Sequence, residues 1–229
     1  MQPHLVFTLT AALGAMGDLA GHERRGTLDW PGRSAILGLL GAALGLRRDD
    51  DFSALEALSI AVAVFDGGTM LRDYHTVETV PSAAVKRANS RPEALRLAGK
   101  LRTNTTITLR DYRGGACYGV AVSGEGLERL RAALERPVFT LWLGRKSCPL
   151  AAPVGARIVS AEGPEQALRH LRLPPWREGA VARRMMVDAT LQDTHVEQRM
   201  DRATDRAHWH FVPRAVAVRA VCIAPEAAA

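Results

Sequence analysis

Four consecutive residues, Arg72, Asp73, Tyr74 and His75, bring a guanidinium group, a phenol ring and an imidazole together. An unpaired RNA base can stack on such a ring, and the other two groups can hydrogen-bond to its edge. An imidazole here could also act as acid or base in metal-free RNA cleavage. A packing cluster at the end of a strand would account for the same residues.

The positive charge of the chain is local. The 229 residues include 30 Lys and Arg against 24 Asp and Glu, a net charge of +6. Residues 72–115 hold nine basic and four acidic residues, a surplus of five within 44 residues. Most of the basic residues are arginine, whose planar fork suits phosphate. This concentration favours a nucleic-acid partner over a plain protein-binding module.

A second candidate segment is Gly144-Arg145-Lys146-Ser147, which resembles a phosphate-binding loop only superficially. A Walker loop needs a further glycine five residues earlier and a helix afterwards, and Pro149 blocks that helix. We therefore expect no ATP site. A basic turn that holds an RNA backbone through amide N–H groups and two cations remains reasonable.

His208 and His210 would lie on the same side of a strand, with His195 upstream. No carboxylate or cysteine spacing completes a metal site around them. The three cysteines are far apart, without a CxxC pair, which indicates a reducing compartment. The longest apolar run, residues 35–46, is too short to span a bilayer. We expect a cytoplasmic protein without metal or cofactor.

The expected elements follow a β-α-β-β-α-β order, which is typical of an α+β ferredoxin-like sheet with an insertion in its middle. Strands are predicted at residues 4–10, 60–65, 117–122 and 138–141, and helices at 35–46, capped by Ser34, and 126–136. A short helix is expected near 53–58, a loop at 11–32 and a threonine-rich strand at 104–109 inside the basic insertion.

We divide the chain at residue 150. Residues 1–150 would form the ferredoxin-like domain, with its insertion at about 72–115. Residues 151–229 would form a β-rich extension packed on it. The extension is expected to hold a strand at 156–160, a helix at 164–173 and a long hairpin between 181 and 222.

The segments 32–50, 72–77 and 143–150 together resemble three motifs of the CasD family of CRISPR Cascade subunits. The segment 109–120 adds a weaker likeness, and all four occur in the family's order. The resemblance implies a protein of the RAMP superfamily. It would have an RRM-like ferredoxin fold, an inserted β-hairpin thumb and a reduced C-terminal β-rich part.

For function, the resemblance implies a non-catalytic RNA-binding subunit of the type I-E Cascade complex in antiviral defence. It would cap the crRNA by gripping its 5′ handle, contact the CasC backbone subunit and the CasA large subunit, and meet target DNA only within the complex. The alternative is a metal-independent endoribonuclease that processes repeat RNA. The expected RNA-binding residues are Arg33, Arg72, Tyr74, His75, Lys86, Arg87, Lys100, Arg102, Arg110, Gly144, Arg145, Lys146 and Ser147.

Overall fold

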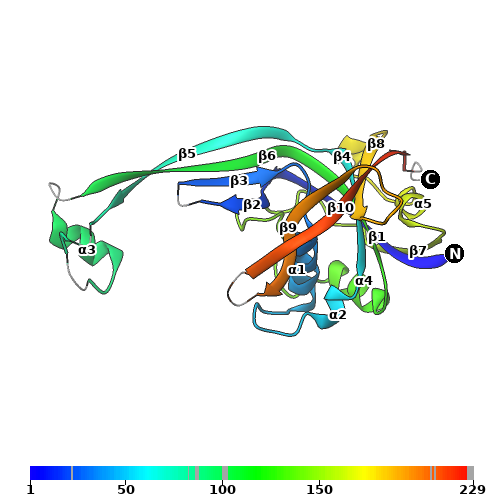
Figure 1. Ribbon diagram of the computed structural model, residues 1–229, viewed down its shortest axis with the longest axis horizontal. Helices are drawn as coiled ribbons and strands as arrows, with labels where there is room; N and C mark the ends of the chain where they lie inside the picture. Colours follow the sequence, from blue (N-terminus) through cyan, green and yellow to red (C-terminus); the bar gives the residue numbers. More distant parts are fainter. Residues whose placement is uncertain are drawn as a thin grey trace.

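The computed structural model describes residues 1–21, 23–81, 83–85, 88–99, 103–206, 208 and 210–225. Within these residues most of the chain is strand, and the helices are few and short (Figure 1). The strands are β1 (Gln2–Gly14), β2 (Met16–Ala20), β3 (Arg24–Leu28), β4 (Ser59–Asp66), β5 (Thr69–Thr79), β6 (Asn104–Ser123), β7 (Arg157–Ala161), β8 (Ala182–Asp188), β9 (Val196–Asp205) and β10 (His210–Ile223). The helices are α1 (Arg33–Leu44), α2 (Ser53–Glu56), α3 (Arg91–Ala98), α4 (Leu127–Glu135), α5 (Pro164–Leu168) and the 3-10 turn η2 (Pro175–Arg177).

The core lies on both faces of four antiparallel strands in the order β7-β1-β6-β4. Side chains alternate between the faces, so Phe7 and Val6 of β1 join different core clusters. One face is covered by α1 and α4, and Leu127, Leu130 and Leu134 of α4 are buried there. The other face is covered in part by α5. Strands β8, β10 and β9 continue the sheet beyond β4.

Strand β6 is 20 residues long and serves two structures. Its second part lies in the sheet between β1 and β4. Its first part pairs with β5 from Thr69 opposite Gly114 to Thr79 opposite Asn104. These two strands leave the body as a long hairpin that ends near α3 (Figure 1). We call residues 69–114 the arm. The residue pattern predicts only a strand at 104–109 here, and the family resemblance implies a β-hairpin; the bounds of β5 and the helix α3 are findings of the structure.

Two predicted segments are wrong in detail. The expected loop at 11–32 instead extends β1 to Gly14 and forms β2 and β3, which pair with each other. Residues 138–141 form no strand, because the N–H groups of Val138 and Phe139 donate to carbonyls at the end of α1. The strand next to β1 is β7, which lies after the predicted division at residue 150.

The start of α1 is held by a distant residue and not by Ser34. The helix begins at Arg33, whose N–H donates to the Asp201 carboxylate of β9 at 2.7 Å. Asp201 is 7% exposed and also accepts from Arg214 of β10 at 2.8 Å. Strands β9 and β10 are thereby fixed across α1 (Figure 1). No helix among the described residues is long and apolar enough to cross a membrane.

Candidate nucleic-acid interface

The base of the arm holds a cluster of arginines around one carboxylate. Asp111 of β6 is 1% exposed and accepts hydrogen bonds from Arg72 of β5 at 2.7 and 3.2 Å. It also accepts from Arg24 of β3 at 3.1 and 3.3 Å. The hydrogen bonds from Arg72 and then Arg24 lower the pKa of Asp111 to about 2, although burial opposes this shift. Asp111 is therefore ionised and orients both guanidinium groups.

A third guanidinium joins this cluster from the loop at 142–149. Arg145 donates to the backbone carbonyl of Asp111 and to that of Arg25, both at 3.1 Å. Its guanidinium carbon lies 4.6 Å from the centre of the Tyr112 ring, a cation–π contact. The group contains three guanidinium groups and one carboxylate, that of Asp111, so it carries a net positive charge. We call Arg24, Arg72 and Arg145 the arginine trio.

The loop that carries Arg145 has a fixed shape. The Leu143 N–H donates to the Cys148 carbonyl at 2.8 Å, and the Ala15 N–H donates to the Leu143 carbonyl at 3.0 Å. Gly144 has φ +88°, and a Cβ there would lie 1.6 Å from the Ala15 carbonyl oxygen. Only glycine lets the loop approach Ala15, between β1 and β2, this closely. Lys146 and Ser147 are exposed beside it, so all four predicted loop residues lie near the base of the arm.

The arm presents different residues on its two faces. Directly paired residues share a face, so Arg72, Tyr74 and Asp111 lie on one side. Tyr74 is 60% exposed there, and Ile107 of the same face is 45% exposed. His75 points to the opposite face, where its Nδ1 lies 2.9 Å from the Asp73 carboxylate. Tyr74 and His75 therefore cannot contact one base together from the same side.

The remaining predicted residues separate into three groups. Arg110 is half-buried and lies on the face of His75. Lys86, Arg87, Lys100 and Arg102 lie outside the described residues. Arg33 is used inside the protein: its side chain is 9% exposed and donates to the carbonyls of Glu56 and Leu58 at 2.7 and 2.8 Å.

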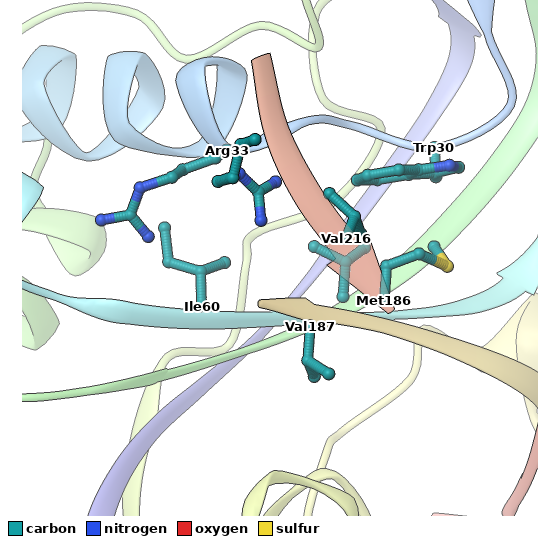
Figure 2. A pocket seen from close by; sticks show the side chains of 8 residues that line it. Trp30, Arg33, Ile60, Met186, Val187 and Val216 are labelled. Carbon is teal, nitrogen blue, oxygen red and sulfur yellow. The ribbon is translucent and has the colours of Figure 1, made fainter. Parts of the chain in front are cut away.

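Figure 2 shows Arg33 emerging from the start of α1 near Ile60, at one side of a small pocket that Trp30 lines from the opposite side. Its guanidinium also lies within ion-pair distance of Glu56 and Asp188, at 3.8 and 3.9 Å. These contacts explain why a basic residue is tolerated at this buried position. Arg33 therefore links α1 to its neighbours and is not among the exposed cations.

Sequence reasoning missed Arg24 and Asp111. Arg24 falls in the segment predicted as a loop. Asp111 lies in the 109–120 segment of weaker family likeness, but otherwise it counts only as one of the four acidic residues of the insertion. β3 runs parallel to β6, with Arg24 opposite Leu109. The signal that could identify Asp111 is its place directly between Arg110 and Tyr112 in a strand-forming stretch, but its partners are 39 and 87 residues away.

Comparison with known proteins agrees with this architecture. The family model described as CRISPR-associated protein (Cas_Cas5) matches residues 4–217. The chain is 34% identical over 186 residues to CRISPR system Cascade subunit CasD of Escherichia coli (strain K12), an alignment that covers 73% of this chain and 76% of that protein.

Two solved structures share the fold. A chain of a CRISPR RNA-guided surveillance complex superimposes with a TM-score of 0.70 at 23% identity, covering 96% of this chain and 90% of that one. The crystal structure of a Cas protein gives a TM-score of 0.61 at 24% identity, with 98% of each chain covered. On the family match and the curated relative, this chain belongs to the Cas_Cas5 family of CRISPR-associated proteins.

Proposed function

We propose that this chain is a non-catalytic RNA-binding subunit of a type I-E CRISPR Cascade complex in antiviral defence. It caps the crRNA by gripping the 5′ handle. The observation that carries this proposal is the arginine trio: three guanidinium groups from β3, β5 and the 142–149 loop converge at the base of an exposed arm. Family membership supplies the complex in which the RNA would be bound.

The proposed grip has two parts. Phosphates of the RNA bind the exposed sides of Arg24 and Arg72, which are 59% and 46% exposed while Asp111 holds them in place. A splayed base stacks on Tyr74, which lies on the same face of the arm. Lys146 and Ser147 hold the backbone at the adjoining loop, and Arg91 and Arg96 of α3 add non-specific attraction.

We further propose that β7-β1-β6-β4 with α1 and α4 form the RRM-like ferredoxin unit and that the arm is its inserted thumb. The strand order and antiparallel pairing support this assignment. Residues 1–150 would carry the RNA-binding surface, and residues 151–229 the β-rich extension. That extension would also lend β7 to the sheet and fix α1 through Asp201.

The neighbours of this subunit would be the CasC backbone subunit and the CasA large subunit, with target DNA present only through the complex. We place the complex in the cytoplasm. Free Cys117 and Cys148, both buried, fit a reducing compartment.

RNA cleavage through His75 is the less favoured alternative. His75 lies on the opposite face of the arm from Tyr74 and the arginine trio, and its Nδ1 contacts Asp73. RNA held on the arginine trio would therefore run along the face of β5 that does not carry His75. Incubation of the full chain with labelled repeat RNA in EDTA separates the two functions: we expect a gel shift without cleavage. Cleavage that disappears in His75→Ala would establish the nuclease.

The grip is tested with Arg72→Gln, which keeps a hydrogen-bonding side chain beside Asp111 but removes the charge. We expect about tenfold weaker binding of handle RNA at low salt, and a plot of log affinity against log salt that is shallower by about 0.7. Arg131→Gln on α4 removes the same charge from a site whose contacts are Glu128 and Glu135, and it is the control. Equal affinities and slopes for both variants would refute the role of the trio.

A further inference from the structure

A second candidate site lies at the other end of β1. A cavity of about 260 Å³ opens on the sheet face opposite α1 and α4. Its exposed lining residues are Gln2, Ser59 and Asp188, while His4 and Ala121 are buried. The cavity therefore runs from the surface down to the sheet.

This cavity is separate from the arginine trio. Gly14 of β1 lies opposite Arg113 at the base of the arm, whereas His4 precedes Gly14 by ten residues on the same strand. At about 3.3 Å per residue the two ends are roughly 33 Å apart. A group bound in this cavity would not touch the trio.

His4 is the unusual residue of the lining. Its side chain is 1% exposed, and Nδ1 lies 3.0 Å from the Gln2 carbonyl oxygen. A carbonyl only accepts, so Nδ1 carries the proton and, in the neutral ring, Nε2 is an acceptor. Nε2 is buried and has no hydrogen-bond partner within the protein. An unsatisfied buried acceptor beside a cavity calls for a donor from outside the chain.

The rest of the lining restricts that donor. Asp188 is paired with Arg214 at 2.5 Å and Arg219 with Asp193 at 2.7 Å, so neither leaves an uncompensated charge in the lining, which favours a ligand without net charge. Ala61 and Ala121 are paired across β4 and β6 and form a flat apolar floor, with Ser59 opposite Ser123 beside them. The volume lies just below the usual range for small-molecule sites, which suits one ring system.

We propose that this cavity binds a single nucleobase that bears an exocyclic amine. The flat ring lies over the alanine floor, and its exocyclic N–H donates to Nε2 of His4. The base belongs to a free nucleoside or is flipped out of an RNA strand; the second source rests on the proposed function, the first does not. The competing occupant is ordered water, which can also satisfy a buried acceptor.

The test uses the full chain with ¹⁵N-labelled histidine, whose ring resonances report the state of His4 Nε2. Adenosine is titrated to millimolar concentration beside purine riboside, which has the same rings without the amine. We expect adenosine to shift the His4 signals and purine riboside to bind at least about tenfold more weakly, because Nε2 of His4 then lacks a donor.

Ser59→Leu and Ser59→Ala are the matched variants. Ser59 is exposed at the mouth, so neither change burdens the core, but leucine fills the entrance. We expect Ser59→Leu to abolish adenosine binding and Ser59→Ala to retain it. A single-stranded oligonucleotide that shifts His4 where free adenosine does not identifies the RNA as the source.

The proposal would be overturned if neither adenosine nor the oligonucleotide moved the His4 signals, or if Ser59→Leu left binding unchanged. Water would then be the occupant. Neither result affects the grip on the handle, which is measured separately with Arg72→Gln.

Discussion

Replacing Asp111 by Asn tests whether one carboxylate organises the base of the arm. Asparagine keeps the shape of the side chain but removes the charge that Arg24 and Arg72 share. The hydrogen bonds lower the pKa of Asp111 from 3.8 to about 2, which at 1.36 kcal/mol per unit corresponds to roughly 2 kcal/mol. Because Arg24 is 59% exposed and the arm is thin, water screens part of this energy. We expect a loss of roughly 1–2 kcal/mol in the free energy of unfolding.

The pH dependence has a definite sign. The pKa of Asp111 is lower in the folded than in the unfolded chain, so the ionised carboxylate stabilises the fold above pH 3.8. That contribution disappears as the pH falls toward about 2. The difference between wild type and Asp111→Asn should be constant from about pH 7 to pH 5 and should shrink below about pH 4.

Urea unfolding of the full chain, followed by circular dichroism over this pH range, measures the difference. Asp49→Asn removes the same charge from an exposed loop after α1 and serves as the control. If Asp111→Asn unfolds like the control at pH 7, or if the difference persists unchanged at about pH 3, the carboxylate does not hold Arg24 and Arg72 as described.

Three further changes test other parts of the structure. Gly144→Ala should destabilise the chain by about 3 kcal/mol, because its Cβ would strike the Ala15 carbonyl; Gly155→Ala, also at positive φ but with open space, should cost less in the same urea titration. Tyr74→Ala should weaken binding of single-stranded handle RNA in a gel shift by about 1–3 kcal/mol, whereas His75→Ala on the opposite face should not; equal losses would refute the division of faces. Asp201→Ala should lower the free energy of unfolding by about 3 kcal/mol, since it removes the cap of α1 and a partner of Arg214, and a loss below about 1 kcal/mol would contradict that role.

Several elements follow from local sequence. The leucines of α4 repeat at helical spacing, so its predicted span of 126–136 differs from Leu127–Glu135 by one residue at each end. The predicted strand at 60–65 lies within β4, whose burial is nearly continuous. The concentration of charge between residues 72 and 115 is also a property of the sequence, and it coincides with the arm. These features need no information about distant residues.

Other features depend on pairing across the chain. The glycine-rich segment at 11–32 forms β2 and β3 because β3 finds a partner in β6, and this brings Arg24 to Asp111. Arg33 is as basic as Arg72 in sequence, yet contacts with Glu56 and Leu58 bury it. The alternation that separates Tyr74 from His75 is local, but it matters only once residues 69–79 are known to pair as a strand.

The concentration of positive charge in one insertion can be read directly from the residues, since charge is counted residue by residue. Which cations are exposed together depends on the folded chain. Hydrogen bonding to Asp111 requires strands and a loop that lie 34 to 87 residues apart to meet at one point, and no local pattern encodes that meeting.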